Sequence, residues 1–219
     1  MSEKHVYFVR HGESEANAAE VDLGDVSVLT AAGRREAERL GDRLRSLADI
    51  QVVFSSPYPR AAGTAAEVAR RVGAPLELMP LFVQRRRPSC VLGKRHYDDA
   101  VREVMEQVFC GYALAGHRHS DEENLDDLRD RTERALAFLE ARDETAICVV
   151  THGMFLRAVL CAILGGPRFP GELFQRSIEC LEPANGALTY VRREPPPRLR
   201  TGETGPVWRL ISWNDTAHL

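Results

Sequence analysis

Short apolar runs alternate with longer amphipathic stretches through most of the chain. Val6–Val9, Gln51–Ser56 and Thr145–Thr151 have the length and composition of strands that are buried on both faces, and Pro75–Met79 is a further candidate. Each of the first three runs stops at a polar turn and is followed by residues with helical spacing. This alternation is typical of an α/β protein whose sheet is mainly parallel.

The positions of apolar and capping residues also predict the helices. Ser14 and Thr30 are suited to cap helix N-termini because a side-chain oxygen can accept from a free backbone N–H of the first turn. Apolar residues then recur at intervals of three and four, which predicts an inward-facing stripe on each helix. The expected helices are Glu15–Ala19, 30 to about 47, 58 to about 73, Asp98–Ala115, Glu122–Arg142 and Met154–Leu164.

The last third of the chain changes pattern and favours β-structure. We expect strands at Ile178–Glu182, Gly186–Arg192 and Val207–Trp213, with Asn185-Gly186 as a turn. Pro195–Gly205 is expected to be a flexible loop or polyproline spacer between the last two strands. Exposed β segments of this kind are compatible with a homodimer.

Composition narrows the class of protein. A chain of 219 residues with 44% hydrophobic and 28% charged residues predicts one ordinary globular domain spanning residues 1–219. The formal charge of −3 gives no reason to expect nucleic-acid binding, and no apolar run is long enough to span a membrane. The five cysteines have no C-x-x-C spacing, and the first residues lack an apolar signal region, so we expect a cytoplasmic protein without disulfides.

Candidate chemistry gathers where the strands end. Arg10-His11-Gly12 follows the first strand, His152-Gly153 follows the strand at 145–151, and Arg60 lies in the first turn of the helix after the second strand. A single histidine after a strand is more often structural than catalytic. Here two His-Gly turns share one architecture, and neighbouring parallel strands would bring His11 and His152 together at the edge where open α/β sheets bind ligands.

These residue types suit a phosphoryl group. Two guanidiniums and two imidazoles near helix N-termini can enclose a tetrahedral dianion, because arginine binds phosphate oxygens bidentately and a helix N-terminus favours negative charge. A neutral imidazole is a competent nucleophile toward phosphorus when its proton is fixed on the other ring nitrogen.

Three blocks in this order resemble the histidine phosphatase superfamily, the phosphoglycerate mutase-like proteins. The blocks are Arg10-His11-Gly12-Glu13-Ser14 with Asn17, Ser55-Ser56-Pro57 through Arg60-Ala61 and Thr64, and Val150-Thr151-His152-Gly153. Thr30–Gly33 and Trp213–Leu219 add to the likeness, which covers essentially the whole chain. The resemblance implies a three-layer α/β/α sandwich with a mainly parallel central sheet.

The resemblance also implies roles for individual residues. His11 would be phosphorylated during turnover, while Arg10, Arg60 and His152 would complete the phosphate pocket. Asn17 would contact a phosphate or substrate oxygen, with help from the backbone N–H groups near Gly12 and Gly153. The implied substrate is a small phosphorylated molecule, and inorganic phosphate would be the product or an inhibitor. The resemblance also implies a reaction that uses neither a metal nor another cofactor.

One position departs from the family pattern. The family usually has a glutamate after the third strand that protonates the leaving oxygen, and our alignment puts Gln84 there. An amide cannot serve as a general acid. Four carboxylates elsewhere are alternative donors if the alignment is shifted, namely Asp98, Asp99, Glu122 and Glu123.

Arg85 opens a basic cluster at the same expected mouth, which could bind a second anionic group of a substrate or be an ordinary solvated loop. Three functions therefore remain open. The first is a phosphatase that acts on a small phosphomonoester through a phosphohistidine. The second is a phosphoglycerate mutase-type transfer, which is weakened because Asn17–Leu29 lacks the Trp- and Gly-containing pattern of that branch. The third is a phospholigand-binding protein with little activity, which Gln84 keeps open.

Overall fold

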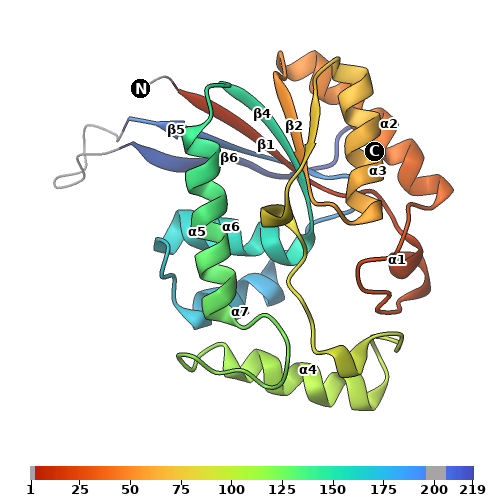
Figure 1. Ribbon diagram of the computed structural model, residues 1–219, viewed down its shortest axis with the longest axis vertical. Coiled ribbons are helices and arrows are strands. Elements are labelled where there is room, and N and C mark those ends of the chain that lie inside the picture. The colour runs from red at the N-terminus through yellow and green to blue at the C-terminus, as the bar shows by residue number, and fades with distance from the viewer. Residues whose placement is uncertain (1–2, 196–205) are drawn as a thin grey trace.

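A computed structural model describes residues 3–195 and 206–219. It contains a central six-stranded sheet with helices on both faces (Figure 1). The strands are β1 (Lys4–Arg10), β2 (Val52–Ser55), β3 (Leu76–Leu78), β4 (Ala146–Thr151), β5 (Leu188–Glu194) and β6 (Val207–Asp215). The helices are α1 (Glu15–Ala19), α2 (Ala31–Leu47), α3 (Pro59–Val72), α4 (Asp99–Gly111), α5 (Leu125–Ala141), α6 (Gly153–Gly165) and α7 (Gly171–Cys180), with 3₁₀ turns η1 (Pro80–Phe82) and η2 (Ser89–Val91).

The strand order is β3-β2-β4-β1-β5-β6. The first four strands in this order are parallel to their neighbours, and β5 runs antiparallel to both β1 and β6. The sheet is therefore mainly parallel, which confirms the predicted fold class.

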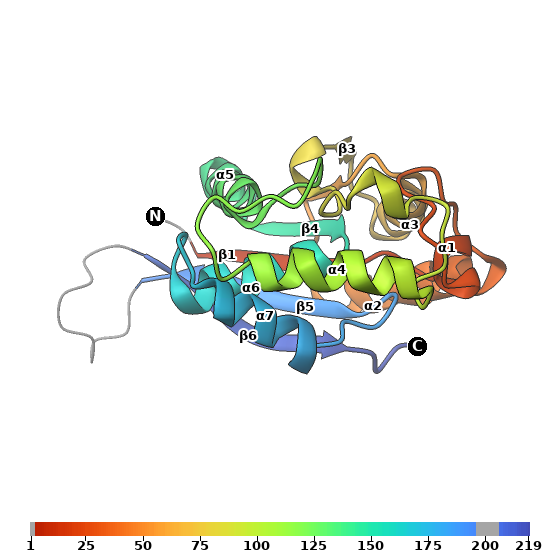
Figure 2. The same cartoon turned by 90° about the horizontal axis from the view of Figure 1, so that it is seen from below.

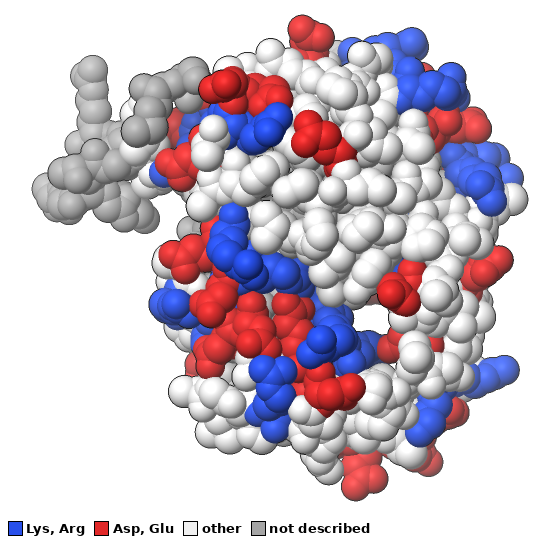
Figure 3. All heavy atoms as spheres, viewed as in Figure 1, with Lys and Arg blue, Asp and Glu red and all other residues white. Residues whose placement is uncertain are grey.

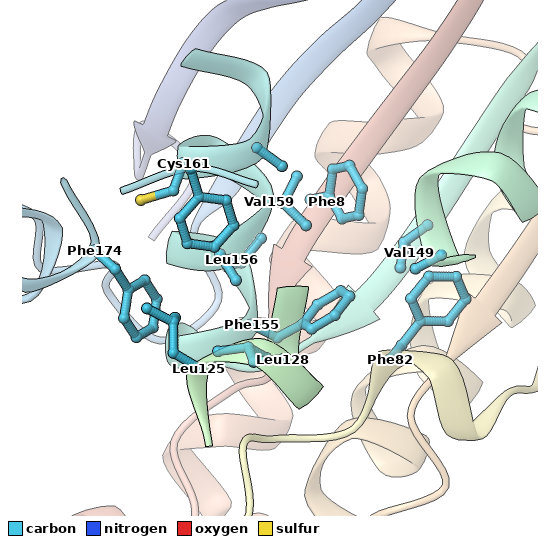
Figure 4. Close-up of a cluster of buried hydrophobic side chains, with 14 of the residues drawn as sticks. Phe8, Phe82, Leu125, Leu128, Val149, Phe155, Leu156, Val159, Cys161 and Phe174 are labelled. Carbon is cyan, nitrogen blue, oxygen red and sulfur yellow. The ribbon is translucent and has the colours of Figure 1, made fainter. Parts of the chain in front are cut away.

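Alternate residues of β1 build two separate cores. Phe8 packs with Val149 and Phe155 on the α5–α6 side, whereas Val9 joins Leu40 and Val68 on the α2–α3 side. Figure 4 shows the first of these clusters. Because strands covered on both faces need apolar residues at every position, this packing explains the continuous apolar runs in the sequence.

The chain leaves β1 and β4 in opposite directions. After β1 it passes through α1 and α2 on one face, and after β4 it enters α6 on the other face. The carboxyl ends of adjacent parallel strands whose connections diverge in this way form the crevice in which open α/β sheets bind ligands. Figure 1 shows α4 set apart from the sheet, below it in that view, and Figure 2, which is seen from below, shows α4 in front of the sheet.

Most elements lie where the sequence predicts them, with shifts of a few residues at their ends. One prediction is wrong: the expected strand at Ile178–Glu182 lies largely in α7 and the turn after it. The side chains of Phe174 and Ser177 share the buried face of this helix, so its period is that of a helix. The predicted loop at Pro195–Gly205 lies almost entirely outside the described residues. Within the described part of the chain, no helix is long and apolar enough to cross a membrane.

Candidate active site

The turn between β1 and α1 is built around a close backbone approach. Gly12 lies so near α2 that a Cβ atom there would be 2.5 Å from the carbonyl oxygen of Gly33. Its amide donates to Thr64 Oγ1 at 3.0 Å, which fixes the turn to α3. The amide of His11 donates to the Thr151 carbonyl at 3.0 Å and continues the pairing of β1 with β4. The turn is thus held from both sides.

The ring of His11 is fixed in one orientation. Its Nδ1 is 2.7 Å from the Gly12 carbonyl, and only an N–H can satisfy that acceptor, so we assign the proton to Nδ1. The lone pair of Nε2 then faces Arg60, whose Nε donates to it at 3.2 Å. His11 is buried, with 3% of its surface exposed. The nitrogen that lacks a proton therefore points into the pocket.

His152 lies beside His11, as the strand pattern predicts. Arg10 of β1 is paired with Thr151 of β4, and the two imidazole rings that follow are 5.0 Å apart between centroids. Nε2 of His152 is 2.8 Å from Ser56 Oγ, and its Nδ1 has no partner among the described residues although it is buried.

Two arginines bring positive charge to the histidines. Arg60, in the first turn of α3, donates from Nη1 to the Gly24 carbonyl at 2.8 Å, and Arg10 donates to the Pro183 carbonyl. Within the described chain, neither guanidinium forms an ion pair with a carboxylate. Burial, followed by repulsion from Arg157, lowers the pKa of Arg10 to about 10. Two poorly neutralised guanidiniums in a buried place form an anion site.

The same environment keeps both imidazoles neutral. Burial lowers the pKa of His11 well below its usual range, and the charges of Arg60 and Arg10 lower it further. The pKa of His152 is lowered in the same direction by burial, then by His11 and Arg60. Both pKa values are lowered because burial and the neighbouring positive charges each disfavour a charged imidazole. His11 is accordingly available as a nucleophile without first losing a proton.

Asn17 lies at the edge of the pocket but is occupied by its own neighbours. Its Oδ1 accepts from the backbone and hydroxyl of Ser14, at 3.2 and 2.8 Å, in a capping box at α1. Nδ2 of Asn185 also donates to this oxygen, at 3.1 Å, and to the His11 carbonyl at 3.0 Å. Asn17 thus ties α1 to the His11 turn, and its amide nitrogen is the part still free for a ligand oxygen.

The two glycines differ in what they offer. The amide of Gly12 is already used by Thr64, so the structure gives this residue a packing role in place of the predicted amide contact. Gly153 begins α6, and a Cβ atom there would be 3.8 Å from Arg10 Nε. First-turn amides have no partner within their helix, so Gly153 keeps a free N–H beside the arginine.

Gln84 lies in a hollow of about 330 Å³ beside the phosphate pocket. Its Oε1 accepts from the Arg85 amide at 3.3 Å. The other side chains that line this hollow are Tyr58, Val83, Arg86, Glu123, Asp127 and Arg131. Figure 3 shows acidic and basic side chains interleaved over the part of the surface around α5, next to an opening. The hollow is thus polar and of mixed charge.

The structure does not bring Arg85 to the histidines. Its side chain is buried at 2% exposure, and its guanidinium carbon lies 5.7 Å from the centre of the Tyr112 ring, near the end of α4. Nε and Nη1 have no partner among the described residues, and burial lowers the pKa of this arginine. Arg85 thus packs against Tyr112, and its binding to a second anionic group of a substrate stays a prediction.

Sequence reasoning missed three residues around the pocket: Ser56, Tyr58 and Asn185. Ser56 holds His152, Tyr58 stacks edge-on against the same ring, and Asn185 links the His11 turn to Asn17. Ser56 could have been found from its place at a strand end, like Arg10. Among the described residues, no three His, Cys, Asp or Glu side chains gather as a metal site.

Comparisons with known proteins agree with this arrangement. A family model described as histidine phosphatase superfamily (branch 1) matches residues 6–194. The probable phosphoglycerate mutase GpmB of Citrobacter koseri is 34% identical over 167 residues, covering 74% of this chain and 75% of the relative. The chain therefore belongs to the histidine phosphatase superfamily, and the predicted family is confirmed.

Solved structures of phosphatases share the fold. The mycobacterial glucosyl-3-phosphoglycerate phosphatase Rv2419c superposes with a TM-score of 0.76 at 20% identity, covering 96% of this chain and 99% of that one. A phosphoserine phosphatase variant from Entamoeba histolytica, in complex with phosphoserine, has a TM-score of 0.73 at 17% identity and covers 99% of both chains. At these identities the likeness concerns the fold alone.

Proposed function

We propose that this protein is a phosphatase that hydrolyses a small phosphomonoester through a phosphohistidine on His11. The observation that carries the proposal is the position of His11 Nε2, 3.2 Å from the buried Arg60 guanidinium, which has no carboxylate partner among the described residues, while Nδ1 lies 2.7 Å from the Gly12 carbonyl. Family membership supports the reaction class, because the superfamily comprises phosphatases and mutases. Solved relatives with the same fold are named as phosphatases.

The proposed reaction has two displacements at phosphorus. Nε2 of His11 attacks the phosphorus atom, and the bond from phosphorus to the ester oxygen breaks. Arg10, Arg60 and His152 stabilise the charge on the three remaining oxygens, the largest expected contribution in such transfers. The Gly12 carbonyl accepts from Nδ1–H and stabilises the positive ring of the phosphohistidine. Water then attacks the phosphorus atom, releasing inorganic phosphate and neutral His11.

Replacement of the nucleophile tests this proposal. His11→Asn retains an N–H donor for the Gly12 carbonyl but removes Nε2, so kcat/KM for para-nitrophenyl phosphate is expected to fall at least about a thousandfold. His5→Asn is the matched control, because His5 lies at the start of the same strand and contacts Tyr190. Wild-type protein quenched during turnover of a radiolabelled ester should carry an acid-labile, alkali-stable phosphoryl label that His11→Asn lacks. Activity retained in His11→Asn would overturn the phosphohistidine.

Two further measurements bear on the finer parts of the proposal. Turnover is expected to be unchanged by excess EDTA, since every step is assigned to side chains, and inorganic phosphate is expected to inhibit competitively. Names of the curated relatives favour one alternative, phosphoglycerate mutase-type transfer. Isomerisation of 3-phosphoglycerate in the presence of the bisphosphate, without net release of phosphate, would support it. Tight phosphate binding without turnover of any ester would indicate a binding protein.

A further inference from the structure

The proposed reaction needs a proton for the leaving oxygen, and Gln84 has none to give. The two carboxylates of the adjoining hollow are also committed. Both oxygens of Glu123 accept from Arg131, at 2.6 and 2.7 Å, in a pair that is largely buried. Oδ2 of Asp127 accepts from the Asn124 amide at 3.2 Å and pairs with Arg118 at 2.5 Å. The oxygens of both carboxylates that make these contacts are thus already engaged by the chain's own donors.

The two arginines that line the hollow, Arg86 and Arg131, are not candidate acids, because a guanidinium does not act as a proton donor of this kind in proteins. The remaining polar side chain that lines the hollow is Tyr58. Its ring centre is 5.2 Å from that of His152 and 5.3 Å from the guanidinium carbon of Arg60. Tyr58 therefore borders the phosphate pocket and the hollow where the rest of the substrate would lie.

Tyr58 is held by the residue that holds His152. Its amide donates to Ser56 Oγ at 3.2 Å, and the same hydroxyl lies 2.8 Å from His152 Nε2. Its phenolic oxygen forms no hydrogen bond with any described residue, so it is free to meet a substrate. Burial, then the charge of Asp25, raises the pKa of Tyr58, and the hydroxyl keeps its proton in the free enzyme.

We propose that the Tyr58 hydroxyl protonates the leaving oxygen and that the tyrosinate then activates the water. The inference rests on the phosphatase reaction proposed above. As the bond from phosphorus to the ester oxygen breaks, that oxygen takes the Tyr58 proton and leaves as an alcohol. In the second displacement the tyrosinate removes a proton from the attacking water, while the electron pair of the phosphorus–nitrogen bond returns to His11. The charges of Arg60 and Arg131 favour the transient tyrosinate.

Tyr58→Phe tests this role by its selectivity. Para-nitrophenol leaves without a proton, so kcat/KM for its phosphate is expected to change less than about threefold. For glycerol 2-phosphate, whose alkoxide needs protonation, kcat/KM should fall roughly 100-fold or more. Because hydrolysis of the phosphohistidine also loses its base, kcat for the aryl ester should fall and the phosphoryl label should accumulate. Tyr190→Phe, which removes a hydroxyl bound to His5, is the control.

Five other outcomes overturn the inference. An equal loss on both esters would give Tyr58 only a packing role against His152 and Arg60, and no loss would give it none. Loss of alkyl turnover in Glu123→Gln or Asp25→Asn, with Tyr58→Phe unaffected, would assign the proton to a carboxylate. If wild-type protein carries no phosphoryl label, the proposed function fails and this inference fails with it. A label with unchanged selectivity refutes the role of Tyr58 alone.

Discussion

The two arginines of the pocket are unusual because neither is paired with a carboxylate within the described chain. Arg10 and Arg60 donate hydrogen bonds to carbonyl oxygens and to His11, whereas most buried arginines are paired with carboxylates. Burying a charged guanidinium away from water has an unfavourable free energy, and hydrogen bonds to neutral acceptors offset only part of it. A dianion placed among them would recover the rest. The excess positive charge of Arg10 and Arg60 is thus the feature that suits the pocket to the dianionic phosphoryl group of the proposed function.

Position 84 allows a prediction at this scale. A carboxyl group introduced by Gln84→Glu would line the same hollow as Tyr58. In a Tyr58→Phe background this carboxyl group should raise kcat/KM for glycerol 2-phosphate at least about tenfold over Tyr58→Phe alone, because general acids contribute roughly 10²- to 10⁴-fold. Gln107→Glu, on the exposed side of α4, is the matched control. Steady-state kinetics on the alkyl ester measures the effect, and no restoration would mean that residue 84 lies out of reach of the leaving oxygen.

The candidate site could be predicted in part from the sequence. Arg10, His11, Arg60 and His152 each follow a strand directly or open a helix, so the topology alone brings them together. Tyr58 and Asn185 could not be found in this way, because their roles depend on which side chain meets which across segments distant in the chain. The burial of Arg85 could not be predicted either, because a basic cluster in the sequence does not specify which of its side chains packs inward.

At the scale of elements, the same limit explains the error at α7. Ile178–Glu182 is a short run that fits a strand or the end of a helix, and period alone does not separate the two. Tertiary packing decides, since a Cβ atom on Gly171 would be 1.8 Å from the Tyr112 carbonyl oxygen and the first turn of α7 rests directly on the segment after α4. The long periodic segments, α2 and α3, had no such ambiguity.

One buried pair joins α5 to the segment that carries Gln84, and its loss is expected to be costly. Arg131 binds Glu123 and donates to the carbonyl oxygens of Leu81 and Val83, at 2.9 and 2.8 Å. A lysine ammonium group cannot make this set of hydrogen bonds, because they need the planar, forked guanidinium of an arginine. Arg131→Lys should therefore lower the free energy of unfolding by about 3 kcal/mol, measured by urea denaturation.

The exposed pair of Arg176 with Glu179 is the control, with side chains 70% and 59% exposed. Arg176→Lys should change stability by less than about 0.5 kcal/mol. If both variants cost the same small amount, the fork of Arg131 does not fix the Gln84 segment, and the geometry of the hollow depends on other contacts.

In the whole molecule, one set of elements positions the two histidines and another set lines the hollow beside them. The sheet pairs β1 with β4 between the two cores, so the histidines that follow these strands are positioned by largely buried strands. The hollow is lined instead by Tyr58, which precedes α3, by residues that follow η1, and by residues at the start of α5. In the proposed reaction the phosphoryl group is bound by residues at the strand ends, whereas the rest of the ester lies against the segments that line the hollow.

The two buried imidazoles also tie the stability of the whole protein to pH. Their pKa values are lowered in the folded state, so below the ordinary value of about 6.5 the unfolded chain binds more protons than the folded one. The free energy of unfolding must then fall as the pH falls below that value, down to the folded pKa values. For two such groups the loss between pH 7.0 and 5.5 is on the order of 2 kcal/mol.

Urea denaturation at the two pH values measures this loss, and His11→Asn should remove about half of it. Saturating phosphate should reduce the loss further, because a bound dianion favours the charged imidazoles. A stability that stays flat from pH 7.0 to 5.5 in the absence of phosphate would show that the histidines take up protons freely in the folded protein. In that case His11 would be protonated at mildly acidic pH and would need a base before it could attack phosphorus.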